Sequence, residues 1–324
     1  MKKIILTVLS VATLSLSLLA QEAPKGKVTG KIFSNYHFQL NQSNANQGFE
    51  LQRAYLGYSY KISDLFSTKV VLDMGNPSNG SKLERTAYVK NALVNFKKDN
   101  LSINFGLIGT TGFKVQEKFW GNRYLFKSFQ DQNKFNTSAD MGISASYKLA
   151  KGLSVDASIT NGEGYKKLQQ DNSYRYGVGL TYKMSDFTFR AYADMYQKDD
   201  NIGPDLENQN TVALFAGYKH DIFSIGAEYN MLSNYKFADK KNMNGFSIYS
   251  TVNISKKLNV FGRFDGLSSK DDWNTKMDGN TIIAGLEFNP VKYVTISPNI
   301  QLFNPKADGA DNISMAYLSV QIKF

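Results

Sequence analysis

The sequence contains no cysteine and few prolines or histidines, and each shortage excludes a class of protein. With no cysteine in 324 residues, it has no disulfide framework, no thiolate metal site and no cysteine nucleophile. There are only six prolines and two histidines. So few histidines disfavour a histidine metal site or histidine acid–base catalysis. Beyond residue 20, no stretch reaches the roughly 18 consecutive apolar residues that a membrane-spanning helix requires.

Aromatic residues are abundant instead, with 19 Tyr and 22 Phe. Aromatic and β-branched residues favour pleated strands over helices. The net charge is +10, but the basic residues are dispersed, whereas a nucleic-acid surface needs a clustered basic footprint. We therefore expect a β protein that does not bind nucleic acid.

The first twenty residues have the features of a secretory signal peptide. Lys2 and Lys3 form a basic start, residues 4–19 are apolar but diluted by Ser and Thr, and Ala20 is a small residue suited to cleavage. The alternative is a membrane-anchoring helix, which the short, serine-interrupted stretch disfavours. We expect residues 1–20 to be a signal peptide and residues 21–324 to form one exported domain.

Apolar and polar residues alternate along nearly the whole of residues 21–324. In residues 224–231, for example, apolar side chains occupy every second position. Period two predicts strands, and segments of roughly 10–13 residues cross a bilayer at a tilt, whereas strands of globular proteins have a mode of about 5–6 residues. We count sixteen segments, beginning near residues 27, 49, 65, 85, 100, 139, 152, 173, 185, 209, 222, 242, 257, 279, 291 and 312.

The connections between these segments alternate in length. Tight turns are expected at residues such as Ser185-Asp186, His220-Asp221 and Asn289-Pro290. Longer polar connections lie between them, for example at residues 161–172 and 198–208. Short turns on one side and long loops on the other are typical of outer-membrane barrels, which have an even number of strands when both termini are periplasmic.

The last segment ends on an aromatic residue. Leu318, Val320, Ile322 and Phe324 share one face, as expected for a strand that meets lipid and ends at the water interface. It resembles the terminal strand of bacterial outer-membrane barrels, where a C-terminal Phe is a recurrent insertion signal. We predict an all-β fold, in which residues 21–324 form a 16-stranded antiparallel transmembrane β-barrel in the outer membrane.

One connection, residues 111–138 after the fifth strand, is far longer than the others. It carries seven aromatic residues and also the basic residues Lys114, Lys118, Arg123, Lys127 and Lys134. Loops above about 12–15 residues are usually functional or disordered. We predict that this loop folds into the lumen as a constriction loop, with a short helical turn at residues 117–123. The alternative is an external loop with an aromatic cluster.

Three short segments resemble those of a known family. They are Phe49-Glu50-Leu51-Gln52-Arg53-Ala54-Tyr55-Leu56-Gly57, Phe119-Trp120-Gly121-Asn122-Arg123 and the terminal Phe324. The family that they resemble is the phosphate-selective porin O and P family of Bacteroidetes-like bacteria. This resemblance implies a sixteen-strand barrel, a homotrimer, and passage of small anions through a constricted lumen. Such porins line the lumen with arginines and constriction-loop lysines.

If the apolar residues face lipid, the opposite face of each strand lines the lumen. The basic residues expected there are Lys31, Arg53, Lys69, Lys90, Arg175, Arg190 and Arg263. The acidic ones are Asp73, Asp156, Asp194, Glu228, Asp265 and Glu287. With the loop lysines added, positive charge is in excess, which predicts a weak-to-moderate anion preference. Alternatively these charges pair and stiffen the wall, as in Arg263 with Asp265 and Arg190 with Asp194.

We expect no enzymatic activity, metal or cofactor. His37 is predicted near the outer end of the first strand and His220 in a periplasmic turn, so the two cannot act together. We expect a passive channel for small solutes, in contact with outer-membrane lipid and lipopolysaccharide. The alternative is a barrel plugged by its long loop that acts in surface adhesion or envelope structure.

Overall fold

The computed structural model describes residues 25–41, 46–75, 84–201, 203 and 205–324. The predicted signal peptide, residues 1–20, lies outside the described residues, as do parts of three predicted connections, at residues 42–45, 76–83, and 202 and 204. Among the described residues, no helix has the length and apolar character needed to cross a membrane.

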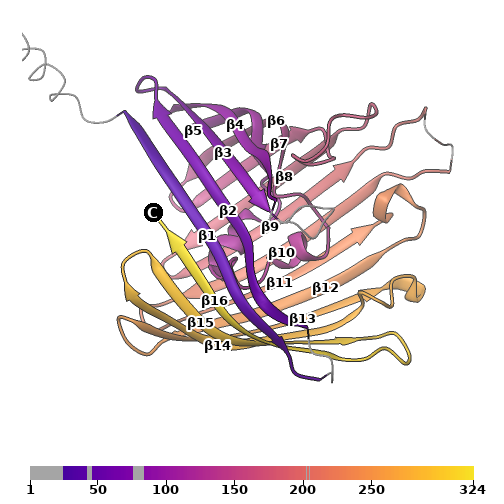
Figure 1. Cartoon of the computed structure of the whole chain (residues 1–324). Coiled ribbons are helices and arrows are strands. Elements are labelled where there is room, and N and C mark those ends of the chain that lie inside the picture. Colours follow the sequence, from indigo (N-terminus) through magenta and orange to yellow (C-terminus); the bar gives the residue numbers. More distant parts are fainter. Residues whose placement is uncertain (1–24, 42–45, 76–83, 202, 204) are drawn as a thin grey trace, which may run out of the picture.

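The described chain forms a closed barrel of sixteen antiparallel strands (Figure 1). Each strand pairs with its neighbours in sequence, and β1 pairs with β16 to close the ring. The strands are β1 (Gly26–Gln39), β2 (Gln47–Lys61), β3 (Phe66–Gly75), β4 (Thr86–Lys98), β5 (Leu101–Gly109), β6 (Ala139–Ala150), β7 (Leu153–Thr160), β8 (Arg175–Met184), β9 (Phe187–Tyr196), β10 (Gln209–Lys219), β11 (Phe223–Ser233), β12 (Met243–Asn253), β13 (Leu258–Ser269), β14 (Gly279–Val291), β15 (Val294–Pro305) and β16 (Ile313–Lys323). The predicted fold class is confirmed, because closure leaves no strand edge exposed to lipid.

Every strand begins close to its predicted position, but one predicted turn is wrong. Strand β14 continues through Pro290 to Val291, and the turn lies at Lys292 and Tyr293, where Tyr293 has a left-handed φ of 77°. The pairing of β14 with β15 shifts between Phe288 and Val291. Pro290 lies within this irregularity, where the N–H that proline lacks is not needed for a regular ladder.

The barrel is apolar outside and polar inside. Several aromatic side chains of the strands are exposed on the outer face, among them Tyr58 at 49% and Tyr147 at 45%. By contrast, Asp73, Thr211 and Asn230 are fully buried on the inner face. This inverted distribution is that of a protein whose outer surface meets acyl chains and whose interior meets water.

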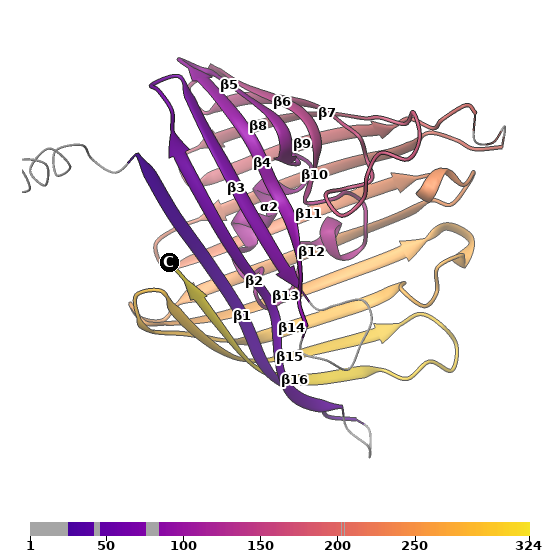
Figure 2. The ribbon, with the colours of Figure 1, turned by 45° about the horizontal axis from the view of Figure 1, so that its top comes forward.

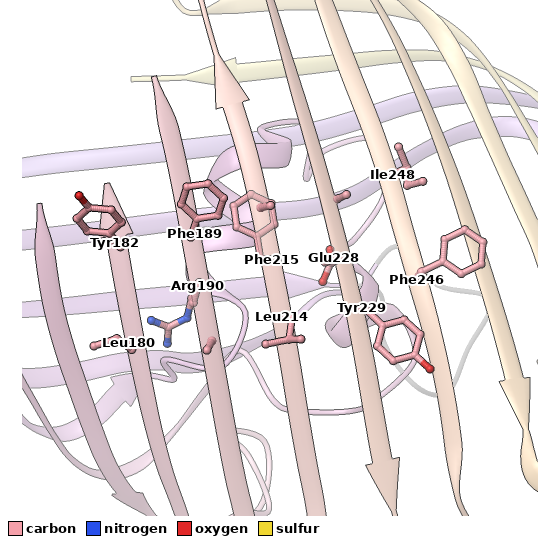
Figure 3. Close-up of a pocket in the computed structure, with 13 residues that line it drawn as sticks. Leu180, Tyr182, Phe189, Arg190, Leu214, Phe215, Glu228, Tyr229, Phe246 and Ile248 are labelled. Atoms are coloured by element: carbon pink, nitrogen blue, oxygen red, sulfur yellow. The ribbon is translucent and has the colours of Figure 1, made fainter. Parts of the chain in front are cut away.

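The outer face also has an apolar hollow of about 650 Å³ across β8 to β12 (Figure 3). Leu180, Leu214 and Tyr229 extend around it. The small side chains of Ala191 and Ala216 leave the space between these larger neighbours. An apolar hollow on this face suits contact with lipid chains.

The two ends of the barrel differ as predicted. Figure 1 shows the start of β1 and the C-terminus at the end with the tight turns, and the longer connections at the opposite end. Short 3₁₀ helices, η1 (Tyr235–Phe237) and η2 (Lys270–Asp272), lie in two of these longer connections.

The long connection between β5 and β6 lies inside the barrel (Figure 2). It contains two helices, α2 (Lys114–Trp120) and α3 (Phe129–Gln132). The predicted helical turn is therefore present, but it begins three residues earlier than expected. Gly121 ends α2 with a left-handed φ of 75° and donates its N–H to the Glu117 carbonyl, a helix end that glycine favours.

Candidate permeation site

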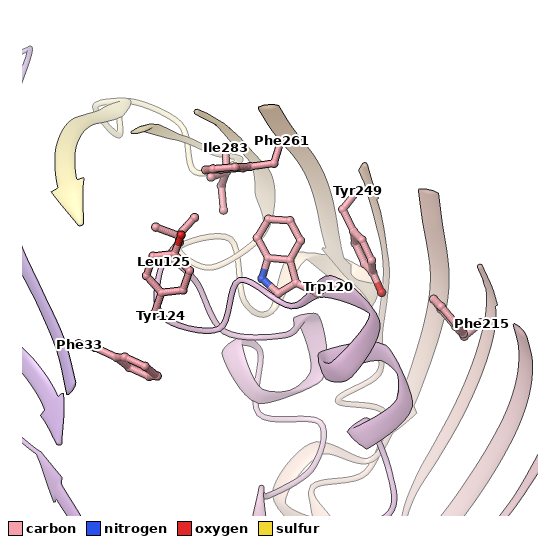
Figure 4. Close-up of a cluster of buried hydrophobic side chains, with 8 residues drawn as sticks. All are labelled: Phe33, Trp120, Tyr124, Leu125, Phe215, Tyr249, Phe261 and Ile283. Carbon is pink, nitrogen blue, oxygen red and sulfur yellow. The ribbon is translucent and has the colours of Figure 1, made fainter. Parts of the chain in front are cut away.

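Aromatic packing holds the long loop against one side of the barrel interior. Trp120, Tyr124 and Leu125 of the loop share a buried cluster with side chains from β1, β10, β12, β13 and β14 (Figure 4). The wall residues are Phe33, Phe215, Tyr249, Phe261 and Ile283. A second cluster joins Phe129 and Phe135 of the loop to Leu232, Met243 and Leu267. These contacts exclude the alternative in which the loop aromatics form an external cluster.

Three predicted lumen arginines hold the loop backbone on this same side. Arg190 donates to the carbonyl of Thr111 at 2.7 Å, Arg263 to that of Lys127 at 2.9 Å, and Arg175 to that of Phe135 at 3.3 Å. A charged donor to a buried carbonyl forms a strong hydrogen bond. We call Arg175, Arg190 and Arg263 the anchor arginines.

Each anchor arginine also pairs with a carboxylate. The predicted pair Arg263–Asp265 is present at 2.7 Å. The predicted pair Arg190–Asp194 is wrong, since Arg190 pairs with Asp156 at 2.7 Å. Residues four apart on a strand are about 13 Å apart, too far for a salt bridge.

Strand register explains which carboxylate each arginine meets. Asp156 pairs in register with Gly179 on β8, and a Cβ at Gly179 would lie 2.4 Å from the Arg190 guanidinium. The missing side chain therefore makes room for Arg190 to reach across β8. Asp194 pairs instead with Arg175 at 2.9 Å.

Most of the remaining predicted basic residues form a separate group between strands β1 to β4 and the loop. Lys31 on β1 interacts electrostatically with Lys69 on β3 and with Glu117 and Arg123 of the loop. Lys90 on β4 interacts with Asp73, Arg123 and Glu117. We call this ring the eyelet: Lys31, Arg53, Lys69 and Lys90 on the wall, and Lys114, Glu117, Arg123, Lys127 and Asp131 on the loop.

Within the eyelet, the arginines are paired with carboxylates. Arg53 pairs with Asp73 at 2.8 Å. Arg123 lies between Glu117 at 3.6 Å and Asp131 at 3.4 Å. These pairs cancel much of the charge of both arginines.

The eyelet lysines are arranged differently. Lys90 lies over the rings of Tyr55 at 5.1 Å and Tyr165 at 5.4 Å, a cation–π arrangement. In the part of the chain that the structure describes, no salt bridge includes Lys31, Lys69, Lys90, Lys114, Lys127 or Lys166. The uncompensated positive charge therefore belongs to lysines.

The loop environment alters the titration of three eyelet groups. Burial, together with the ammonium of Lys69, lowers the pKa of Lys114 below its ordinary value. Burial also lowers the pKa of Lys127 and raises the pKa of Glu117. Each shift favours the neutral form of the group, as desolvation does in general.

Two predicted loop residues lie outside this ring. Lys118 is exposed on α2, one turn after Lys114, with which it interacts electrostatically. Lys134 is exposed in a left-handed turn with φ 60°, next to the buried Phe135. His37 contacts Asn35 on β1, and His220 lies in the turn between β10 and β11, so the two histidines are at opposite ends of the barrel.

A contact that sequence analysis missed comes from the connection between β7 and β8. The hydroxyl of Tyr165 donates to Asp73 at 2.5 Å, and Lys166 lies over the ring of Tyr88 at 4.5 Å. This connection therefore also reaches the lumen. The sequence signal was one aromatic residue, Tyr165, within a largely polar loop.

No protein-family model matches the sequence, and no curated protein matches it. Several solved structures share its fold. OmpF of Salmonella typhi, solved in complex with daunomycin, is 13% identical with a TM-score of 0.70, over 92% of this chain and 97% of that one. An anion-selective porin from Comamonas acidovorans is 11% identical with a TM-score of 0.69, over 92% and 99%. The outer-membrane channel DcaP of Acinetobacter baumannii is 10% identical with a TM-score of 0.69, over 92% and 97%. The chain therefore has the fold of outer-membrane porins, and this fold places it in the bacterial outer membrane.

Proposed function

We propose that this protein is a passive outer-membrane porin that admits small hydrophilic solutes and prefers anions. The observation that carries the proposal is the eyelet, where arginines are paired with carboxylates and lysines are not. Lysines without a paired carboxylate attract anions and replace part of their hydration shell. The anchor arginines bind the loop backbone from β8, β9 and β13, whereas the wall lysines of the eyelet lie on β1, β3 and β4.

The packing of the loop also bears on the alternative function, surface adhesion. Trp120 is 2% exposed and Phe129 is fully buried. Large aromatic side chains that are buried inside the barrel offer no surface to an external partner. The proposal is therefore a channel rather than an adhesive barrel.

The reversal potential of the full chain in planar bilayers tests this proposal. Under a tenfold KCl gradient, we expect stepwise conductance and a reversal potential of the sign for chloride preference. The triple variant Lys31→Gln, Lys90→Gln, Lys114→Gln removes three ammonium groups that make no salt bridge in the described part of the chain. It should lower the chloride-to-potassium permeability ratio by about threefold or more, since close charges interact strongly in a narrow pore.

Lys97→Gln with Lys98→Gln is the matched control, because both lysines are exposed at the tight-turn end of β4. This control should keep the reversal potential of the unmodified protein. A folded barrel without conductance, or one that prefers potassium, would overturn the proposal.

We extend the proposal to inorganic phosphate as one of the permeant anions, in line with the family resemblance. Lysine binds phosphate as a point charge, and several eyelet lysines can act on one ion. Phosphate should then reduce the chloride current at millimolar concentration, and the triple variant should lose this block. Unchanged chloride current in phosphate would restrict the proposal to a general anion preference.

We also propose that the barrel assembles as a homotrimer in contact with lipopolysaccharide, as the family resemblance implies. Mass measurement of the detergent-solubilised complex, with and without bound lipopolysaccharide, tests the assembly. A monomer under both conditions would reject it.

A further inference from the structure

We propose that the lumen holds a second site, above the eyelet, which binds small uncharged solutes that have one hydrophobic face and several hydroxyl groups. This inference rests on the proposed channel function, since a solute must enter the barrel to reach the site. The site is a cavity of about 240 Å³ between the loop around α3 and the wall strands β13 to β16. We call it the vestibular pocket.

The vestibular pocket lies on the side of the barrel with the long loops. Its lining includes Met277, just before β14, Gly279, at the start of β14, and Ile313, at the start of β16. Both strands start at the end opposite the tight turns, and Met277 and Ile313 are exposed. A solute entering from outside therefore meets this pocket before the eyelet.

One part of the lining is aromatic or aliphatic. Phe126 and Phe129 come from the loop, and Leu267, Phe303 and Met315 come from the wall. Phe129 belongs to the second loop cluster and is fully buried. This part of the pocket is held by packing, so it presents a preformed apolar surface to one face of a ring.

Polar groups converge on the same space from four directions. Gln132 from α3, Thr281 from β14, Gln301 from β15 and Tyr317 from β16 all line the pocket. In the described part of the chain, the side chains of Gln132, Thr281 and Tyr317 make no hydrogen bond to protein. Gln301 uses its amide nitrogen on Leu125 and Asn299, which leaves its amide oxygen as an acceptor. A few placed polar groups on an apolar lining are typical of small-molecule sites.

The charges around the pocket indicate an uncharged ligand. Among the described residues, no lysine or arginine lines it, and Asp265 is the only carboxylate in its lining. Both carboxylate oxygens of Asp265 accept hydrogen bonds from Arg263, at 2.8 and 2.7 Å. Because this carboxylate is neutralised, the pocket attracts neither anions nor cations, in contrast to the eyelet.

The size of the pocket limits the ligand. Sites for drug-sized molecules have volumes of about 300–1,000 Å³, and the vestibular pocket is smaller. It therefore suits a molecule of one ring, with one face on Phe126 and Phe303 and its hydroxyl groups toward Thr281, Gln301 and Tyr317.

Isothermal titration calorimetry of the intact detergent-solubilised barrel with methyl β-glucoside tests the inference, because this probe is uncharged and has a single ring with an apolar face and several hydroxyl groups. We expect saturable binding. The double variant Thr281→Val, Tyr317→Phe keeps the volume of the pocket but removes two hydroxyls, so its affinity should fall about tenfold. If the double variant does not fold, as judged by its heat-modifiable mobility on gels, Thr281→Val alone should lower the affinity about threefold.

Lys31→Gln serves as the matched control, because it changes the eyelet and leaves the pocket lining intact. It should bind the probe like the unmodified protein while its anion preference falls. This inference alone is overturned if the barrel conducts and prefers anions but does not bind the probe. It is also overturned if the substitutions at Thr281 and Tyr317 leave the affinity for the probe unchanged. A barrel that binds the probe but does not conduct overturns the proposed channel function instead.

Discussion

The ring of Phe324 lies directly over Gly30 at the seam where the barrel closes. The Gly30 N–H donates to the Phe324 carbonyl at 2.8 Å, and the Phe324 N–H donates to the Gly30 carbonyl at 3.0 Å. A Cβ at Gly30 would lie 2.2 Å from the tip of the Phe324 ring. The absence of a side chain at residue 30 therefore leaves room for the tip of the Phe324 ring against β1.

The first prediction concerns this contact. Gly30→Val should displace the Phe324 ring and destabilise the seam by about 1–3 kcal/mol, the usual cost of overpacking. The ring is the end of a side chain and can move aside, so the barrel should still form. The temperature at which the folded barrel converts to the unfolded mobility on gels should fall.

Gly262→Val is the matched control for strand propensity. Gly262 also lies within a strand, β13, but the nearest atom to its added Cβ would be the Ile283 carbonyl oxygen at 3.9 Å. If the two variants unfold at the same temperature, the Phe324 ring contributes nothing to closure.

The second prediction uses the opposed charges of the loop. Arg123→Gln removes a cation and leaves Glu117 and Asp131 without their shared partner. We expect the anion preference to fall by about twofold or more, because both freed carboxylates face the eyelet. Glu117→Gln should act in the opposite direction and raise the preference.

Reversal potentials of the two variants at one salt gradient provide the measurement. Lys118→Gln, which removes a charge outside the eyelet on the same helix, estimates the effect of any charge change on α2. Shifts of the same sign for Arg123→Gln and Glu117→Gln would show that Arg123 does not mask the two carboxylates.

How far sequence could predict this molecule depends on which interactions set each feature. Strand positions follow from period two and from turn residues, which are local, so all sixteen strands begin within about three residues of expectation. The turn predicted at Asn289-Pro290 was wrong. This pair is typical of a turn, but here an irregularity in strand pairing accommodates it. The inward position of the long loop was predictable from its aromatic residues.

Charge pairs between strands, such as Arg190–Asp156, were not predictable because they depend on register, whereas the predicted pair Arg263–Asp265 lies within one strand. The pairing of β1 with β2 shifts between Phe33 and Ser34, and that of β3 with β4 shifts between Val71 and Leu72. Each shift changes which side chains meet across the lumen. The contact of Tyr165 with Asp73 joins residues 92 positions apart, and no local pattern encodes such a contact.

The third prediction is a dependence of selectivity on pH. The lowered pKa values of Lys114 and Lys127 mean that both lose their protons below the ordinary lysine value of 10.5 as pH rises. Anion preference should therefore decline in the alkaline range before ordinary lysines titrate. The pKa of Glu117 is raised above its ordinary 4.5, so Glu117 becomes neutral earlier on acidification and anion preference should increase there.

Reversal potentials measured from about pH 4 to pH 10 test both the acidic limb, where anion preference should increase, and the alkaline limb, where it should decline. Glu117→Gln should flatten the acidic limb only, and Lys114→Gln with Lys127→Gln should flatten the alkaline limb only. A selectivity that is constant across this range would contradict the assignment of these groups to the eyelet.

The final prediction separates two roles of Arg263, which pairs with Asp265 and anchors the loop. Arg263→Met leaves the buried Asp265 without a partner, a change that typically costs about 3–5 kcal/mol, and removes the hydrogen bond to the Lys127 carbonyl. We expect lower thermal stability and a noisier open-channel current, because the loop loses a fixed point. The double variant Arg263→Met, Asp265→Met replaces the pair by apolar side chains, which is often neutral for stability, but it does not restore the anchor. It should therefore unfold near the temperature of the unmodified protein while its current stays noisy. A quiet current in the double variant would show that aromatic packing alone holds the loop in place.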